Sequence, residues 1–216
     1  MNRSDVNGLR FARQSAPPNR RHTILFLSST LSGIDQRALD REARSIQKEL
    51  EQCFYRDCFE FKTRWAAEPL DLLREFRKLR PTVVQLNGHG DPNGLSFQAT
   101  DGHAQLVSAE ALGDAFSAAG ASVKLVVLSA CYGKAQVEML LRYVDCVVWM
   151  DGPIHPDSAR CFATGFYGGL GEFEPIEAAF KQGRAAIRLE GLPDSDRPQF
   201  KVRDRLDAGK LVLIDD

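Results

Sequence analysis

Residues 124 to 136 read KLVVLSACYGKAQ and contain an apolar run, Leu125 to Leu128, that stops shortly before Cys131. Four apolar residues without alternation are typical of a strand buried on both faces, as in a parallel sheet covered by helices. A second run of this kind lies in PTVVQLNGHGDPNG, residues 81 to 94, and ends at His89 between two glycines. Because open α/β sheets bind ligands beyond the carboxyl ends of their strands, the two runs predict a thiol and an imidazole at one sheet edge.

The segments around these two strands alternate between strand and helix patterns. Further strands are predicted at residues 24–27, 57–65 and 144–150, and the 57–65 strand alternates with period two, as an edge strand does. Helical periodicity is found around residues 39–50, 69–80, 111–120, 134–143, 157–167 and 174–188. This alternation predicts a parallel, right-handed α/β sheet with helices on both faces.

Several local patterns make more detailed predictions. In the first helix, Leu39 and Ile46 should face the core, whereas Glu42 should lie on the solvated face. In the second helix, the apolar residues at helical spacing predict a core face made of Leu70, Leu73, Phe76 and Leu79.

Four further predictions concern turns and ends. Asp101-Gly102 should form the turn of a hairpin, and Ser108 should cap the helix that follows. Gly168 to Gly171 should separate the last two helices, and GKLVLIDD, residues 209–216, should add a short edge strand.

Length, composition and charge limit the classes of protein that this chain can be. With 216 residues, 44% of them hydrophobic, we expect one domain over residues 22–216 after a flexible, polar tail over residues 1–21. The 28 Lys and Arg residues balance 29 Asp and Glu residues without a basic stripe, so we expect no nucleic-acid partner. No apolar stretch is long enough to span a membrane, and no signal-peptide core is present. We therefore expect a cytoplasmic protein whose five cysteines are thiols.

The chemistry that a Cys and His pair supports is nucleophilic catalysis. A thiol with an unperturbed pKa is a weak nucleophile at neutral pH, and a neighbouring imidazole or helix N-terminus favours the thiolate. His89 is flanked by glycines that let the backbone turn sharply, and Cys131 precedes a predicted helix. The backbone N–H groups of Gly90 and Cys131 are then candidates for an oxyanion hole.

The order of the two residues narrows the class of enzyme. His89 precedes Cys131 by 42 residues, whereas papain-like proteases have the cysteine first. LNGHG followed by LSACYG resembles the two signature strands of the caspase-like cysteine peptidases of clan CD. The segments ILFLSSTLSGIDQRALDREARSIQKEL and VVLSACYGKAQVEMLLRYVDCVVWMDGPIHPDSARCFATGFYGGL are similar to the CHAT branch, the bacterial caspase-like domains related to separases. The similarity runs from about residue 22 to residue 190.

This resemblance implies a fold, an activity and partners. The implied fold is a caspase-like three-layer α/β/α sandwich with a mainly parallel sheet, here a bacterial short form. The implied activity is a cysteine endopeptidase that uses His89 as general base and Cys131 as nucleophile, without metal or cofactor. A protein substrate and an activating sensor or partner protein are expected, in a bacterial defence or stress pathway such as antiviral defence. Many family members continue Cys-x-Thr/Ser-Gly, whereas this chain has Tyr132-Gly133-Lys134 after the cysteine.

The resemblance also predicts where the side chain before the scissile bond, P1, binds. The segment after the last predicted core strand lines this pocket in caspase-like folds, which makes Trp149, Asp151 and Asp157 candidate substrate-binding residues, with Tyr132 narrowing the cleft. An aspartate here would favour a basic P1 residue. The alternative for Asp157 is that it caps a helix together with Ser158. Caspases also use the position two before the cysteine, which here is the uncharged Ser129.

Other interpretations remain open. The chain is alternatively a catalytically silent caspase-like interaction module, in which Cys131 is a packing residue. A different Cys-His hydrolase or an amidotransferase would show a nucleophile elbow with glycine on both sides, which Ser-Ala-Cys-Tyr-Gly lacks. The Cys53 and Cys58 pair has no second pair for zinc, Cys146 and Cys161 fit core positions, and His155 is a weaker candidate for the base.

Overall fold

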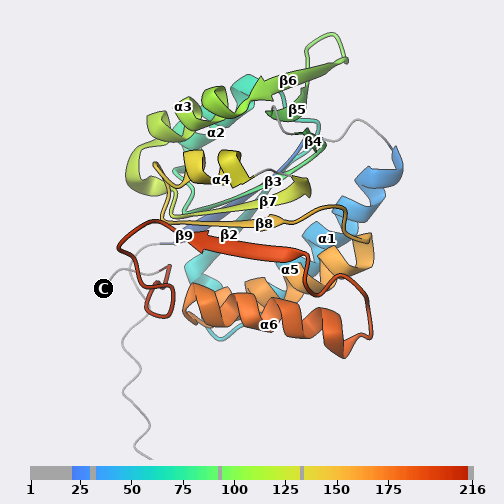
Figure 1. Cartoon of the computed structure of the whole chain (residues 1–216), viewed down its shortest axis with the longest axis vertical. Coiled ribbons are helices and arrows are strands. Elements are labelled where there is room, and N and C mark those ends of the chain that lie inside the picture. Colours follow the sequence, from blue (N-terminus) through green and yellow to red (C-terminus); the bar gives the residue numbers. More distant parts are fainter. Residues whose placement is uncertain (1–20, 30–32, 92–93, 132–133, 214–216) are drawn as a thin grey trace, which may run out of the picture.

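A six-stranded sheet forms the centre of the protein (Figure 1). The computed structural model describes residues 21–29, 33–91, 94–131 and 134–213. The strands lie in the order β2-β1-β3-β7-β8-β9; the first five are parallel, and β9 pairs antiparallel with β8. They are β1 (His22–Ser28), β2 (Phe59–Arg64), β3 (Val83–Asn87), β7 (Leu125–Cys131), β8 (Cys146–Met150) and β9 (Pro198–Val202). The predicted, mainly parallel α/β sheet is confirmed.

Helices cover both faces of this sheet, so the fold has three layers (Figure 1). One face is covered by α1 (Gly33–Gln52), α5 (Pro156–Gly171) and α6 (Ile176–Leu189), and the other by α2 (Pro69–Leu79), α3 (Ala109–Ala119) and α4 (Lys134–Leu140). In β1, Ile24 and Phe26 pack toward α1, α5 and α6, whereas Leu25 and Leu27 pack toward α2, α3 and α4. This is why the strand reads as an unbroken apolar run, since both of its faces are buried. Short 3₁₀ turns, η1 (Arg56–Cys58) and η2 (Gly120–Ser122), follow α1 and α3. None of the helices in the described ranges combines the length and apolar character needed to cross a bilayer.

The second helix begins at Pro69 as predicted, but its buried face is rotated. Leu70 is 68% exposed, whereas Leu72 and Phe76 are 2% and 3% exposed and pack into the core. Leu72, Phe76 and Leu79 are spaced by four and three residues, which also fits one face of a helix. The prediction that Leu70 faces the core was therefore wrong, because two helical faces in this segment carry leucines.

A second, small sheet lies beside the carboxyl end of β3. It consists of β4 (Gly90–Asp91), β5 (Gly94–Gln98) and β6 (Ala104–Ser108). The hairpin predicted at Asp101-Gly102 joins β5 to β6, and Gly102 has the positive φ of 86° that its turn requires. Ser108 accepts a hydrogen bond from the backbone of Ala111 and so caps α3, as predicted. Leu95 and Phe97 of β5 are fully buried and hold the small sheet against the core.

The last two predicted helices are present, but the break between them lies at residues 172–175 and not in the glycine-rich stretch at residues 168–171, because α5 continues to Gly171. These glycines allow close packing instead. A Cβ atom on Gly169 would lie 2.7 Å from Cα of Ala179 in α6, and one on Gly171 would lie 2.5 Å from Sγ of Cys53 after α1. Glycine lowers helix propensity by about 1 kcal/mol, and here the gain in helix packing offsets that cost. The predicted position of the break was therefore wrong.

Replacing Gly169 with alanine is expected to destabilise the protein by about 1–3 kcal/mol, since the added methyl group would push α6 away from α5. Urea unfolding measures this loss. Gly209→Ala is the control, because a Cβ atom at that position would meet nothing nearer than 3.4 Å. Equal stability of the two variants would contradict the packing role of Gly169.

The carboxyl-terminal edge strand is β9 and not the predicted strand over residues 209–216. Phe200 and Val202 of β9 alternate with polar residues and pack against the α1/α5/α6 core. Residues 209–213 are not a strand; the backbone N–H of Ile176 donates to the Leu211 carbonyl, and Leu213 is buried. Their apolar residues anchor this segment beside α6, which explains the strand-like composition. Residues 214–216 lie outside the described ranges, as do residues 1–20 of the predicted tail.

Candidate active site

The two predicted catalytic positions lie at the same edge of the sheet because β3 and β7 are neighbours. The strands are parallel, and their last register pair is Asn87 with Ser129. His89 and Cys131 each come two residues after that pair, on strands that are about 4.8 Å apart in such sheets. The pairing of β7 with β8 shifts between Leu128 and Cys131 and resumes at Cys131 with Met150. The backbone of Cys131 is thus described, whereas its side chain and the whole of Tyr132 lie outside the described residues.

Local contacts fix the turn that carries His89. The His89 carbonyl accepts a hydrogen bond of 2.9 Å from the backbone N–H of Ser96 in β5. Ser29, just after β1, donates its hydroxyl to the Ser96 and Asn87 carbonyls. A Cβ atom on Gly88 would lie 2.2 Å from that Ser29 hydroxyl oxygen, so a larger residue before the histidine would displace the Ser29 hydroxyl from its hydrogen bonds. The backbone at His89 is therefore held by both sheets, while its side chain is exposed.

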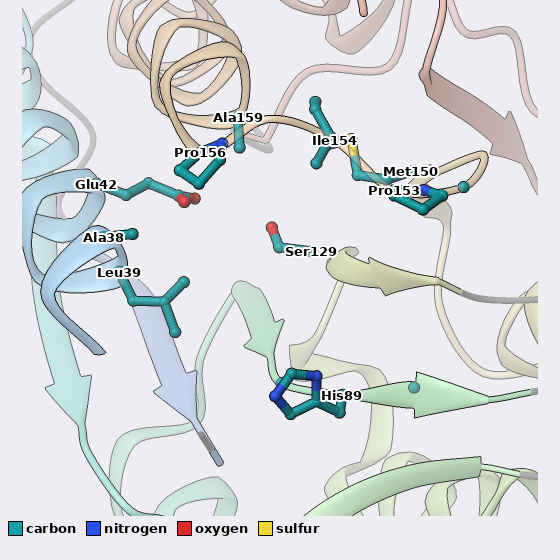
Figure 2. A pocket seen from close by; sticks show the side chains of 13 residues that line it. Ala38, Leu39, Glu42, His89, Ser129, Met150, Pro153, Ile154, Pro156 and Ala159 are labelled. Atoms are coloured by element: carbon teal, nitrogen blue, oxygen red, sulfur yellow. The ribbon is translucent and has the colours of Figure 1, made fainter. Parts of the chain in front are cut away.

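A cavity of about 340 Å³ opens beside His89 (Figure 2). Its walls come from α1, from the turn between β3 and β4, from β7, and from the segment that joins β8 to α5. Its lining is mostly apolar and consists of Ala38, Leu39, Glu42, Gly88, His89, Gly90, Ser129, Met150, Gly152, Pro153, Ile154, Pro156 and Ala159. A concave, mainly apolar pocket with a few converging polar groups is the usual form of a small-molecule or side-chain site.

Glu42 is a pocket residue that sequence reasoning missed. It was predicted to be solvated, yet it is only 4% exposed, and Figure 2 shows its carboxyl group extending from α1 into the cavity. The prediction was wrong because the position of Glu42 in the helix, not its charge, decides which face of α1 carries it. Glu42 comes three residues after Leu39 and four before Ile46, which puts it on the buried face of α1. That spacing was the available signal.

A buried polar network holds Glu42 in place. The Gln85 side chain of β3 donates from Nε2 to Glu42 Oε1 at 2.7 Å, with Asn87 Oδ1 at 3.0 Å and Ser129 Oγ at 3.2 Å from the same nitrogen. The Tyr167 hydroxyl of α5 donates to Gln85 Oε1 at 2.8 Å. Gln85 and Asn87 are two residues apart, so both reach the same face of β3. The network joins α1, β3, β7 and α5 beneath the cavity.

Burial is the main cause of the raised pKa values of Glu42 and Tyr167. Desolvation raises the pKa of Glu42 to about 7, and the hydrogen bond from Gln85 offsets only part of this effect. Desolvation, and then the neighbouring Glu42, also raise the pKa of Tyr167 well above its ordinary value. A carboxyl group with a pKa near neutrality that lines the same cavity as an exposed histidine is a combination found at functional sites.

Three of the predicted pocket residues, Trp149, Asp151 and Asp157, lie outside the lining of this cavity, and the fourth, Tyr132, lies outside the described residues. Trp149 packs into the opposite core, with α2, α3 and α4. Asp151 is exposed, and its backbone N–H donates to the Arg197 carbonyl at 2.8 Å. Asp157 lies in the first turn of α5, where its negative charge interacts favourably with the helix dipole. Its Oδ1 atom lies 3.6 Å from a guanidinium nitrogen of Arg160. The helix cap is His155, whose Nδ1 accepts from the Asp157 backbone. The alternative that Asp157 and Ser158 form the cap was therefore wrong.

The remaining cysteines have structural positions. Cys53, Cys58, Cys146 and Cys161 are buried and unpaired. Burial raises the pKa of Cys53 to about 11 and raises the pKa values of the other three thiols as well. Thiols of this kind are poor nucleophiles at neutral pH. The core positions predicted for Cys146 and Cys161 are confirmed.

Solved structures with a similar fold are cysteine proteases. A secreted C11 cysteine protease from Bacteroides thetaiotaomicron, solved with an irreversible peptide inhibitor, aligns with a TM-score of 0.62 and 12% identity, over 79% of this chain and 59% of that chain. An inactive zymogen C11 protease from Parabacteroides distasonis aligns with a TM-score of 0.57 and 11% identity, over 82% of this chain and 61% of that one. The protein thus has the caspase-like α/β fold and spans about three fifths of each of these two proteases. No protein-family model and no curated protein matches the sequence.

Proposed function

We propose that the protein is a cysteine endopeptidase in which His89 is the general base and Cys131 the nucleophile. The observation that carries this proposal is the register of β3 and β7, in which both residues follow the pair Asn87–Ser129 by two positions. Similarity of fold to C11 cysteine proteases supports the same class of activity. A protein substrate follows from this class.

The proposed reaction follows from the chemistry of the two side chains. The imidazole of His89 takes the thiol proton, and the thiolate sulfur attacks the peptide carbonyl carbon. The backbone N–H groups of Gly90 and Cys131 stabilise the oxyanion of the tetrahedral intermediate. His89 then protonates the leaving amine, and water hydrolyses the thioester to regenerate the thiol. No step needs a metal or cofactor.

An electrophilic peptide probe tests the proposal. A peptidyl acyloxymethyl ketone is expected to alkylate Cys131 in the full chain, and mass spectrometry of the digested protein identifies the site. The other four cysteines are an internal control, because their buried thiols with raised pKa values should react slowly with the probe. His89→Ala should suppress labelling, whereas His103→Ala, which removes an exposed histidine in the β5–β6 hairpin, should not. Labelling that is unaffected by His89→Ala, or absent from Cys131, favours the silent interaction module instead.

The finer predictions rest on the resemblance to CHAT domains. These are assignment to that branch, activation by a sensor or partner protein, and a role in bacterial defence. The cytoplasmic location is proposed from the free cysteines, of which the four with described side chains form no disulfide. A low activity of the isolated chain that rises when a partner is added would support activation by a partner.

A further inference from the structure

Building on the proposed peptidase function, we propose that Glu42 determines which substrate side chain enters the cavity beside His89. In its ionised form the carboxylate would hold a cationic Arg or Lys side chain, and in its protonated form the cavity would accept a neutral side chain. The charge preference of the site would then change with pH. Glu42 would replace Asp151 and Asp157 as the acidic residue of the pocket.

The position of the carboxyl group is the first observation behind this proposal. Of the described residues that line the cavity, Glu42 alone carries a carboxyl group. Ser129, two residues before Cys131, supplies a hydroxyl group in place of a charge, and Figure 2 shows it directed toward the same space. Leu39, Met150 and Ile154 form apolar walls that suit the aliphatic stem of a long side chain.

The hydrogen-bond network provides the second observation. The amide nitrogen of Gln85 has two N–H groups, yet three acceptor oxygens lie within 3.2 Å of it, on Glu42, Asn87 and Ser129. At least one acceptor therefore shares a proton. A ligand that brings additional N–H donors would satisfy these oxygens, and an ammonium or guanidinium group brings the most. When Glu42 is protonated, its own O–H group is an additional hydrogen-bond donor.

The surroundings of Glu42 explain why its charge would follow pH. From β3 and β7 it is faced by the neutral groups of Gln85 and Ser129, and the start of α5 contributes Pro156 and Ala159 to the cavity wall. Among the described residues, the ionisable groups that interact with Glu42 or share its cavity are the Tyr167 hydroxyl from α5 and the His89 ring. Burial raises the pKa of Glu42 to about 7, so its ionised fraction changes about tenfold between pH 6 and pH 8. A cation bound in the cavity would favour the ionised form of Glu42, so that binding would release the carboxyl proton.

Two substrates that differ only in charge test the proposal. The full chain is assayed with fluorogenic peptides carrying either arginine or its neutral analogue citrulline at P1. The ratio of their kcat/KM values is expected to rise about tenfold from pH 6 to pH 8 in the wild type, and the titrations of His89 and Cys131 cancel in this ratio. Glu42→Gln should keep the Gln85 hydrogen bond but lower the ratio at pH 8 by about 10- to 100-fold and remove its pH dependence.

Asp157→Asn is the matched control, because it neutralises a carboxylate outside the cavity lining and should leave the ratio unchanged. A ratio that responds to Asp157→Asn and not to Glu42→Gln would overturn the proposal. A wild-type ratio that is the same at pH 6 and pH 8 would overturn it as well.

A binding measurement separates this proposal from the peptidase proposal. Benzamidine, an amidinium cation, is titrated into the catalytically silenced Cys131→Ala protein, and the shift in melting temperature is recorded at pH 6 and pH 8. A larger shift at pH 8, lost in the Cys131→Ala/Glu42→Gln protein, supports the role of Glu42 even if no peptide is cleaved. Equal shifts with and without the carboxyl group reject it even if cleavage is observed. Failure of probe labelling at Cys131 bears on the peptidase function alone.

Discussion

Replacing Cys131 with alanine is expected to lower peptide hydrolysis by about a thousandfold or more, because no other group in the proposed site can form the thioester. His89→Ala should cost a comparable factor, and the double variant little more, since residues that act as one unit do not contribute additively. Steady-state kinetics with a fluorogenic peptide measures all three variants. The fold should persist, because alanine is small and Cys131 is the last residue of β7.

The control for this experiment is His103→Ala, which removes an exposed histidine from the turn of the β5–β6 hairpin. It should retain wild-type activity, and circular dichroism should show that every variant is folded. Near-wild-type hydrolysis by either Cys131→Ala or His89→Ala would reject the dyad. If His103→Ala also lost activity, the loss in His89→Ala would reflect disturbance of the small sheet and not removal of a catalytic imidazole.

Replacing Glu42 with glutamine is expected to stabilise the protein at pH 8, by up to about 3 kcal/mol. The folded-state pKa of about 7 lies above the ordinary value of 4.5, so the folded protein binds the Glu42 proton more tightly than the unfolded chain does. In the wild type this favourable contribution is fully present below about pH 4.5 and is lost as pH rises through 7. The Glu42→Gln variant has no carboxyl group to titrate at this position, so it does not lose this contribution to stability between pH 4.5 and pH 8.

Urea unfolding of the wild type and Glu42→Gln at pH 5 and pH 8 measures this difference. The free energy of unfolding of the wild type should fall by about 2–3 kcal/mol more than that of the variant between the two pH values. Asp157→Asn, at a half-exposed position in the first turn of α5, should follow the wild-type profile. Parallel pH profiles for wild type and Glu42→Gln would mean that Glu42 keeps an ordinary pKa in the folded protein.

The apolar runs of the sequence predicted the central sheet because burial on both faces leaves a strong pattern. Leu125 to Leu128 and Val83 to Val84 are buried as expected, and their parallel pairing follows from the alternation of strands and helices. The hairpin at Asp101-Gly102 was predictable since its turn chemistry is local. Strand β9 was missed: its alternation covers only five residues and begins with Pro198.

The predictions that failed depended on tertiary contacts. Glycines at 168–171 suggest a break when they are considered alone, and only the approach of Ala179 and Cys53 shows that they pack inside a helix. The residue type of Glu42 predicts a solvated side chain, and only the hydrogen bond from Gln85, which itself accepts one from Tyr167, reveals a buried network. Likewise, the resemblance led to Asp151 and Asp157, whereas the packing of α1 against the sheet brings a different carboxyl group to the cavity. Each of these features depends on contacts between segments far apart in the sequence, which sequence patterns do not show.

The cavity also has a consequence for the order of events during synthesis of the chain. Its walls come from α1 near the amino terminus and from the start of α5 much later, and the Tyr167 hydroxyl donates to the Gln85 side chain that holds Glu42. Domains generally fold as units during synthesis, so an element that is added late completes the fold late. A nascent chain that ends before residue 156 already contains His89, Cys131 and Glu42, but it lacks the Pro156 and Ala159 wall and the Tyr167 donor. The proposed pocket for a substrate side chain is therefore complete only after α5 has been synthesised, later than the proposed catalytic residues themselves.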